Sequence, residues 1–320
     1  MDTTDRQLFA ASLRQAAERA SGGTLDHALH EMGWADALDD DPQAAISQLF
    51  AIQGETGATS SALDQVVRHA LGPTSDPEAP VVLPPVDRWD PPGTLAGDRL
   101  EVGGVVALSG AAPDALVVVV EADGVTAAWA VAGADLDLRP VRGLDPDLGL
   151  VSVHGDTVAG GTRLALADDR WPAAVARARL ALAHQLVGAA TTMLGRARTH
   201  ALERVQFGVT ISSFQAVRHR LAEALVAIET AQAVIDAAWR DGSPASAAMA
   251  KAAAGREART VARHAQQVLA GIGFTTEHDL HRYVRRVVVL DGLLGTSRSV
   301  TTALGHELLA SRQLPPPLPL

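Results

Sequence analysis

The chain has 320 residues, of which 47% are hydrophobic, and its 37 acidic and 27 basic side chains give a formal charge of −10. This length supports one large or two to three small domains with a sizeable core, and the acidic balance argues against nucleic acid as the main partner. The absence of cysteine excludes disulfides, cysteine-ligated zinc and a thiol nucleophile. No apolar run reaches the roughly 18 residues of a membrane span, and the first residues lack a signal-peptide layout. We therefore expect a cytoplasmic protein with no membrane partner.

Residues 1–80 are predicted to form an N-terminal helical domain. Apolar residues recur near helical spacing in two segments: Leu8, Leu13 and Ala17, then Leu25, Leu29 and Met32. Gly22-Gly23 and the Thr24 that follows are typical of a helix stop and a new N-cap. A further helix is expected from Pro42 to Ile52. The acidic run Asp39–Asp41 opens it and suits the positive end of the helix dipole.

Residues 81–168 are predicted to form a small β domain of five to seven strands. The stretch from Gly72 to Asp98 is rich in proline and acidic residues, which indicates a boundary or a loose connection. Short β-prone runs separated by Gly, Asp and Pro then follow: LEVGGVVAL, ALVVVVEA, TAAWAVA and LGLVSV.

Residues 169–312 are predicted to form a C-terminal four-helix bundle. Helical patterns cover residues 171–200, 211–241, 244–270 and 297–311, with a shorter helix near 277–289. Short turns between long helices favour antiparallel packing. The Pro-rich tail at 313–320 is expected to be extended. The predicted fold class is therefore mainly α with a small central β domain.

Three segments in the last third of the chain carry a specific pattern. They are ERVQFGVTISSFQAVRHRLAE (Glu203 to Glu223), QVLAGIGFTTEHDLHRYVRR (Gln267 to Arg286) and LLGT (Leu293 to Thr296). Together they resemble the C-terminal helical domain of the acyl-CoA dehydrogenases. The resemblance implies that family's order of an N-terminal helical domain, a middle β domain and a C-terminal four-helix bundle, which the composition indicates independently.

The resemblance assigns cofactor contacts to the first segment. Arg204 is implied to contact the FAD pyrophosphate of a neighbouring subunit, because a guanidinium offers a rigid fork of donors suited to phosphate. Phe207 is implied to pack near the same cofactor, and Gln215 to frame this region. Gln206 stands inside the motif and is counted with these cofactor-binding candidates.

The other two segments extend the implied FAD site. Gln267 and Gly271 match a glutamine and a glycine that hold the adenosine half of FAD in the partner's site, and Ala270 replaces the family's first glycine. Thr296 matches a threonine that contacts the flavin. Arg298 stands where a glutamine often does the same.

The family's catalytic base is missing from this pattern. In the family a glutamate removes the α-proton of the acyl thioester, and Leu294 occupies its position. A leucine cannot accept a proton. The second placement of the base in the family falls at Arg177–Leu180, which holds no carboxylate. Asp291 and Glu277 are the candidate replacements for the base. Each also has a structural interpretation: Asp291 as the partner of an arginine, and Glu277 as the residue that begins the short helix.

The middle domain also lacks the family's chemical residues. Neither the Ala-Gly-Ser-Asp loop nor the strand ending in Trp-Ile-Thr-Asn appears between residues 84 and 168. Trp89, Trp129 and Trp171 stand in other contexts, so packing roles are expected for all three.

Two further clusters have structural interpretations. His278 and His281 beside Asp279 resemble a metal site only superficially, and no metal is expected because the histidines show no zinc-binding spacing with matching ligands. The three arginines of the short helix are expected to form an ion-pair network: Arg282, Arg285 and Arg286. Asp291 is expected to pair with one of the last two.

The retained residues match the part of the family pattern that reaches across a subunit interface. The resemblance therefore implies a non-catalytic subunit of a heteromeric (α2β2) acyl-CoA dehydrogenase. The stretch MGWADALDDDP…QGETGATSSALDQVVRHALG, between Met32 and Gly72, resembles the short actinobacterial type that acts on steroid side-chain CoA thioesters. The partner would hold the catalytic glutamate and most of the substrate pocket, and an electron-transferring flavoprotein would reoxidise the FAD. Two alternatives stay open: a self-sufficient homotetrameric dehydrogenase with a relocated base, and a flavin-free structural or sensing relative.

Overall fold

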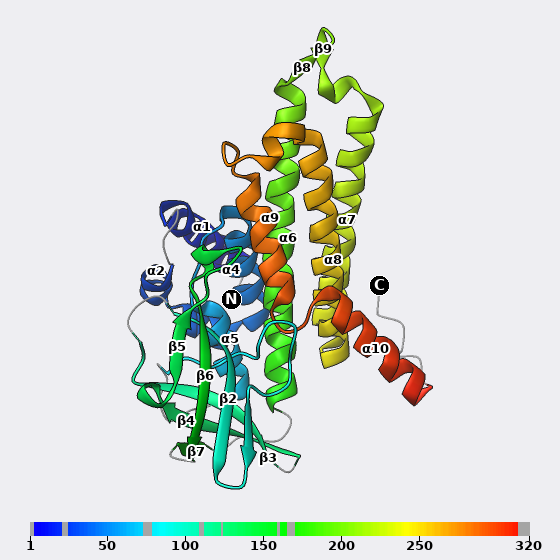
Figure 1. Cartoon of the computed structure of the whole chain (residues 1–320). Coiled ribbons are helices and arrows are strands. Elements are labelled where there is room, and N and C mark those ends of the chain that lie inside the picture. The colour runs from blue at the N-terminus through cyan, green and yellow to red at the C-terminus, as the bar shows by residue number, and fades with distance from the viewer. Residues whose placement is uncertain are drawn as a thin grey trace.

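Helices predominate in the computed structural model. In the order of the chain, a seven-stranded sheet follows the N-terminal helices and precedes the C-terminal ones, and it lies at one side of the helices (Figure 1). The structure describes residues 3–20, 25–72, 79–108, 112–122, 124–158, 161–164 and 170–312. The predicted helix stop at Gly22–Gly23 and the predicted extended tail at 313–320 lie outside these residues. The predicted fold class is confirmed.

Five helices precede the sheet. They are α1 (Thr3–Arg19), α2 (Asp26–Glu31), α3 (Trp34–Asp40), α4 (Pro42–Thr56) and α5 (Ala62–Leu71). The predicted start of α4 is confirmed: the Asp41 carboxylate accepts a hydrogen bond from the Ala44 N–H at 3.1 Å, and Pro42 takes the first helical position. The helix runs past the predicted Ile52 to Thr56, where Gly57 ends it with a positive φ.

The sheet has seven strands among the described residues, in the order β5-β6-β2-β1-β3-β4-β7. The strands are β1 (Gly93–Ala96), β2 (Arg99–Ala107), β3 (Ala115–Ala122), β4 (Val125–Ala132), β5 (Asp137–Pro140), β6 (Leu150–Val158) and β7 (Thr162–Leu164). Neighbouring strands are antiparallel except for the parallel pair β1–β3. All four β-prone runs of the sequence lie in strands, as predicted.

The expectation of a loose connection before the sheet is wrong for its described part, residues 79–98. Val81 and Leu83 form single bridges with Val117 and Val105, and both are buried. Gly93–Ala96 then becomes β1, inserted between β2 and β3. Pro91 and Pro92 before it and the turn at Gly97, which has a φ of 65°, keep this strand short. β1 still pairs with β2 on one side and with β3 on the other.

The C-terminal helices form the bundle. They are α6 (Arg170–Glu203), α7 (Gln215–Asp241), α8 (Pro244–Leu269), α9 (Leu280–Gly292) and α10 (Ser297–Ser311). The fourth member of the bundle is the short α9, which packs on α6 and α8, whereas α10 contacts α8 and angles away (Figure 1). Because α9 begins at Leu280, Glu277 lies in the exposed turn before it, and the expectation that Glu277 starts this helix is wrong.

Close backbone approach joins the N-terminal helices to the bundle. A Cβ added to Gly54 of α4 would overlap the Gln185 carbonyl oxygen of α6, and a Cβ on Gly188 of α6 would overlap the Ala51 carbonyl oxygen. The paired glycines therefore set the distance between α4 and α6.

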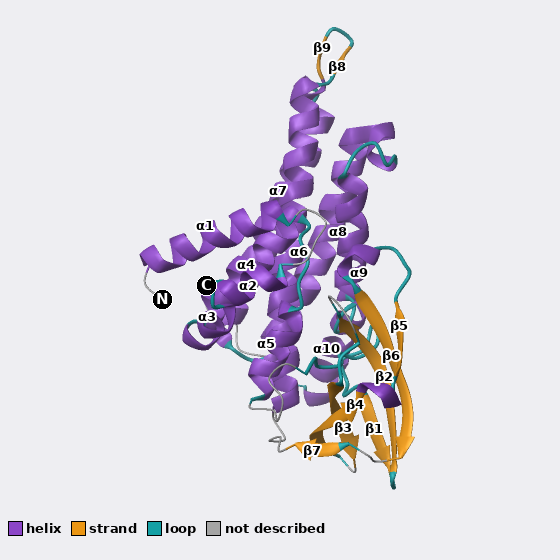
Figure 2. Cartoon of the chain, turned by 90° about the vertical axis from the view of Figure 1, so that its left-hand side faces the viewer, coloured by secondary structure: helices purple, strands orange, loops and turns teal. Residues whose placement is uncertain are grey.

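One face of the sheet packs directly on the bundle. Val105, Val117 and Val119 belong to the same buried apolar cluster as Trp171 and Val175 of α6. Figure 2 shows the sheet as a layer beside one half of the bundle, with the other half standing free of it. Within the described residues, no helix combines the length and the apolar character needed to cross a membrane.

Candidate functional site

The first motif forms a small hairpin at the free tip of the bundle (Figure 1). After α6, the strands β8 (Val205–Gln206) and β9 (Val209–Thr210) pair, and the short 3-10 turn η3 (Ile211–Ser213) leads into α7. Phe207 and Gly208 make the turn with φ angles of 54° and 80°. Glycine tolerates this conformation without strain, whereas a phenylalanine adopts it only where the hairpin holds it.

The predicted cofactor residues of this hairpin point away from the chain. Arg204, Gln206 and Gln215 are exposed, and Phe207 is 92% exposed with only an edge-to-face contact to Phe214, at 6.3 Å between ring centroids. No carboxylate among the described residues forms a salt bridge with Arg204. These side chains are thus available to a group outside this chain.

The second motif lies at the same end of the bundle, where α8 passes into the 3-10 helix η4 (Ala270–Phe274). Ala270 has φ 51° and ψ −133°, a combination that glycine adopts far more readily. A non-glycine residue held there costs about 1–3 kcal/mol. Ala270 therefore keeps the backbone shape that a glycine would give.

The two glycines of this motif differ in what surrounds them. A Cβ on Gly273 would lie 2.9 Å from Leu269 Cβ, so packing within the chain requires that glycine. A Cβ on Gly271 would meet no atom within 4 Å, and its φ is not positive. No described residue therefore requires glycine at 271, and the space that its Cβ would occupy is open. The side chain of Gln267 is exposed nearby on the last turn of α8.

The third motif lies at the opposite end of α8 and is packed into the molecule. Leu293, Leu294 and Gly295 are buried, and Leu294, at 1% exposure, has a positive φ of 55°. Thr296 caps α10: its hydroxyl accepts the Ser299 N–H at 3.1 Å, and its own N–H donates to Asp87 Oδ1 at 2.8 Å. The structure thus brings Arg204 and Gly271 to one end of the bundle and leaves Thr296 at the other.

Arg179 lies next to Leu294, the position at which the family resemblance places the catalytic base. It comes from the second placement of the family's glutamate, and its Nε donates to the Leu294 carbonyl oxygen at 3.1 Å. Its guanidinium lies 5.1 Å from the centroid of the Trp89 ring. Burial lowers the pKa of Arg179 to about 10, which still leaves it protonated at neutral pH. The two places at which the family resemblance expects a glutamate, Leu294 and the segment around Arg179, are therefore in contact with each other. Neither of these two residues has a carboxylate.

Asp291 does not pair with Arg285 or Arg286, so that prediction is wrong. It lies between α8 and α10, where its Oδ1 is 3.7 Å from Lys251 Nζ and accepts the Ser297 N–H at 2.9 Å. Its Oδ2 accepts hydrogen bonds from Arg259 at 3.3 Å and from the Ser297 hydroxyl at 3.2 Å. A carboxylate with both oxygens engaged and 1% exposure is poorly placed to serve as a base.

Lys251 is the residue whose importance the sequence reading missed. It is fully buried, and its ammonium donates to the carbonyl oxygens of Asp291 and Gly295, which fixes the turn between α9 and α10 onto α8. Burial lowers the pKa of Lys251 to about 8, against the opposing effect of Asp291. One signal was available: it is the only lysine in the sequence, inside an alanine-rich helix.

The arginine cluster of α9 and the histidines before it make structural contacts within the chain. An ion-pair role is confirmed for Arg282, which meets Asp147 at 3.5 Å, and for Arg286, which pairs with Asp145; both bind α9 to the loop before β6. His278 Nδ1 accepts the Leu280 N–H at 3.0 Å and so caps α9. Across the described ranges, no three histidine or acidic side chains are grouped to hold a metal ion.

The three tryptophans serve packing, as expected. Trp171 is buried, and its Nε1 donates to the Trp89 carbonyl oxygen at 3.1 Å. The ring of Trp89 lies against Gly295, where an added Cβ would come within 2.7 Å of it. Trp129 packs on the face of the sheet that turns away from the bundle.

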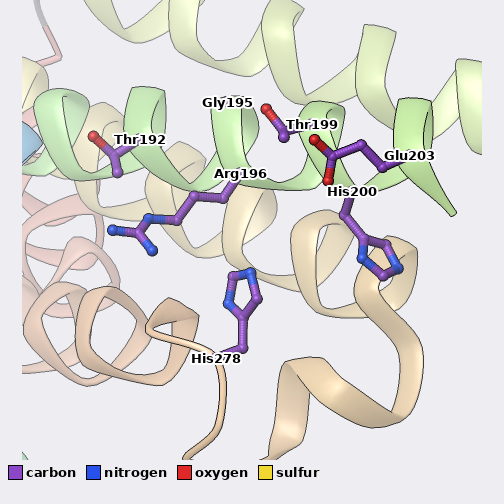
Figure 3. Close-up of a pocket in the computed structure, with 7 residues that line it drawn as sticks. All are labelled: Thr192, Gly195, Arg196, Thr199, His200, Glu203 and His278. Atoms are coloured by element: carbon purple, nitrogen blue, oxygen red, sulfur yellow. The ribbon is translucent and has the colours of Figure 1, made fainter.

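A hollow of about 480 Å³ opens between α6 and the loop before α9. Figure 3 shows Arg196 and His200 pointing from α6 toward the loop that carries His278. Burial, and then the charge of Arg196, lower the pKa of His278; burial and Arg204 lower that of His200. None of the predicted cofactor residues lines this hollow.

The C-terminal helices match a known protein family. Residues 172–309, which span α6 to α10, match the family described as "Acyl-CoA dehydrogenase, C-terminal domain". These residues form a C-terminal domain of the acyl-CoA dehydrogenase family. The resemblance that the three motifs indicated is therefore confirmed.

Individual relatives agree with this membership. Acyl-CoA dehydrogenase IpdE2 of Mycobacterium tuberculosis is 35% identical over 173 residues, which cover 54% of this chain and 52% of that protein. The chain thus spans about half the length of the curated relatives it matches. The same protein in Mycolicibacterium smegmatis is 35% identical over 152 residues, 48% of each chain.

Among solved structures, the ChsE4–ChsE5 complex from Mycobacterium tuberculosis is similar over almost the whole fold. It aligns with a TM-score of 0.73 and 20% identity over 98% of this chain and 99% of that one. The steroid acyl-CoA dehydrogenase Tcur3481–Tcur3483, in its G363A variant, aligns with a TM-score of 0.70 and 24% identity over 96% of this chain and 88% of that one. At these identities the likeness shows the fold alone.

Proposed function

We propose that this chain is a non-catalytic subunit of a heteromeric, FAD-dependent acyl-CoA dehydrogenase and completes the flavin site of its partner. The observation that carries the proposal is the contrast between the two ends of the bundle. At one end Leu294 and Arg179 fill the place of the base. At the other end Arg204, Phe207 and Gly271 are exposed, and among the described residues Arg204 has no salt bridge and Phe207 has only its edge-to-face contact with Phe214.

The exposed residues fit FAD held from outside the chain. Arg204 would pair with the pyrophosphate, because its guanidinium is exposed and free of a salt bridge with any described carboxylate. Gln267 would hydrogen-bond the adenosine half, Gly271 would allow that half to approach the backbone, and Phe207, with Gln206 and Gln215 beside it, would flank the cofactor. Bound FAD supplies the acceptor for the hydride from the β-carbon of the acyl thioester.

In this proposal the partner supplies the glutamate that removes the α-proton. This chain's residues orient the cofactor and exclude water from one side of it. Leu294 contributes no proton transfer, and Thr296 stays in its role as the cap of α10. Two of the similar solved structures, a steroid acyl-CoA dehydrogenase and the two-component ChsE4–ChsE5 complex, favour a steroid side-chain CoA thioester and a heterotetramer. A cytoplasmic location and an electron-transferring flavoprotein as oxidant complete the proposal.

The test is the flavin content and the assembly mass of this chain, purified alone and co-expressed with a catalytic acyl-CoA dehydrogenase chain from the same organism. We expect flavin only in the mixed complex, at about one per heterodimer. Arg204→Ala should lower the FAD affinity of that complex at least tenfold, which corresponds to about 1.4 kcal/mol of binding free energy. Arg285→Ala is the matched control, because Arg285 is an exposed arginine on α9, away from the hairpin.

Two results would contradict the proposal. One flavin per chain in a homo-oligomer of this chain alone would support the self-sufficient enzyme with a relocated base. A mixed complex whose flavin content is unaffected by Arg204→Ala would support the flavin-free alternative for this subunit.

A further inference from the structure

A groove runs between α6 and α7 next to the β8–β9 hairpin. Its volume is about 530 Å³, and its lining is mainly leucine and alanine. Leu202 and Leu225 form its walls and are each 50% exposed. An apolar hollow of this size on a helix pair is large enough to accept a leucine or phenylalanine side chain.

The groove comes from helical spacing. On α7 the lining residues are three, four and seven positions apart, namely Arg218, Leu221, Ala222 and Leu225, so all lie on one face of the helix. The face that packs into the bundle is a different one, with Ala224, Ala227 and Ile228 buried. α7 therefore has a second apolar face, on which Leu221 packs in part against the bundle core, whereas Ala222 and Leu225 are exposed.

The exposed apolar surface continues from the groove onto the hairpin. Val205, Val209 and Phe214 are all more than a third exposed, and Phe207 is almost fully so. Contiguous apolar surface of this kind is uncommon on a monomer and marks a protein contact. The hairpin and the groove thus form one continuous surface, which we name the hairpin face.

The charges on the hairpin face indicate what covers it. Arg198 and Arg218 flank the groove, and Arg218 is held in position because its Nε donates to the Ser212 carbonyl oxygen at 2.7 Å. Within the part of the chain that the structure describes, no carboxylate forms a salt bridge with either arginine. A second copy of this chain, docked by the same face, would place arginine against arginine across a two-fold axis. A different protein with carboxylates around an apolar side chain fits better.

We propose that the groove between α6 and α7 receives a helix of the partner dehydrogenase subunit, through an apolar side chain flanked by carboxylates that pair with Arg198 and Arg218. This inference rests on the proposed function and goes beyond it, because it assigns the contact that holds the two subunits together to residues other than those assigned to FAD. Subunit association and flavin retention then depend on different side chains of the hairpin face.

The experiment measures both quantities in the co-expressed complex. Leu225→Asp and the double variant Arg198→Glu/Arg218→Glu should each weaken subunit association at least tenfold, by titration of the separated subunits and by native mass. Leu309→Asp is the control, since Leu309 is 76% exposed on α10, away from the groove. Circular dichroism of each variant alone checks the fold, and a half-exposed position such as Leu225 should tolerate the change.

The outcomes of this experiment separate the groove assignment from the proposed function. Unchanged association in both groove variants overturns the inference, and so does a homodimer of this chain that Leu225→Asp disrupts. If association is unchanged while Arg204→Ala still releases flavin, the proposed function stands and only the groove assignment fails. If Leu225→Asp separates the subunits but flavin does not depend on Arg204, the groove assignment stands and the proposed cofactor role fails.

Discussion

Arg179 on α6 donates its Nε–H to the backbone carbonyl of Leu294, at 3.1 Å, across 115 residues of sequence. The same guanidinium lies over the ring of Trp89, so one side chain joins α6, the loop before β1 and the turn before α10. Arg179→Ala should lower the free energy of unfolding by about 2–4 kcal/mol, because it leaves a buried carbonyl unpaired and a cavity beside Trp89.

Chemical denaturation of the isolated chain measures this effect. Arg298→Ala is the control, because Arg298 is an exposed arginine in the same region and should change the free energy of unfolding by less than about 0.5 kcal/mol. Equal effects of the two substitutions would show that the Arg179 contacts contribute little.

The buried Lys251 predicts an unusual dependence of stability on alkaline pH. Its pKa is about 8 in the folded chain against 10.5 for an ordinary lysine, so the unfolded state binds the extra proton between these values. The free energy of unfolding should therefore rise between pH 8 and 10.5, by about 1.4 kcal/mol per pH unit from this group. Below pH 8 the cost of burying the charge is fully present.

The double variant Lys251→Met/Asp291→Asn removes both charges of the pair and should abolish this rise. Urea denaturation at pH 7.5, 9 and 10 in the two proteins gives the comparison. Parallel profiles in wild type and variant would show that Lys251 titrates normally in the folded chain.

The crossing of α4 and α6 depends on Gly188. Gly188→Ala should destabilise the chain by about 1–3 kcal/mol, because the new Cβ would overlap the Ala51 carbonyl and force the helices apart. Gly195→Ala on the same helix meets nothing within 4 Å and should stabilise by about 0.5–1 kcal/mol through helix propensity. Thermal unfolding of both variants should give midpoint shifts of opposite sign. Shifts of the same sign would contradict the close approach.

Gly271 and Gly273 separate a cofactor role from a packing role. Gly271→Ala has room within this chain and should leave the unfolding midpoint unchanged, while lowering FAD affinity in the mixed complex about tenfold. Gly273→Ala should lower the midpoint, since its Cβ would press on Leu269. Flavin fluorescence during dilution of the complex reports the first effect. Full flavin retention in Gly271→Ala would remove Gly271 from the proposed FAD contacts.

Local patterns were enough to predict the helices and most of the sheet. The apolar repeats of α6, α7 and α8 and the valine-rich run of β3 lie where the sequence places them, since each pattern is read within one element. β1 was missed because a four-residue strand amid prolines has no pattern of its own. It exists because β2 and β3 pair with it on either side.

The motifs of the candidate site could be predicted from the sequence, but the residues that contact them within the chain could not. Asp291 was assigned to an arginine of its own helix, which is the nearest cation in sequence, whereas its partners Lys251 and Arg259 come from α8. The contacts of Arg179 with Leu294 and Trp89 likewise link segments far apart in the chain. Such pairings depend on how helices cross, and neither periodicity nor spacing encodes that.

Because the only lysine of the sequence is fully buried, the folded surface of the described chain carries its positive charge entirely as guanidinium and imidazole. Reagents that acylate amines therefore find no lysine on this surface, and enzymes that modify lysine cannot reach one without opening the contact between α8 and the turn before α10. Acylation of Lys251 would record that opening. The residue that fixes the turn thus also makes its release visible to simple covalent chemistry.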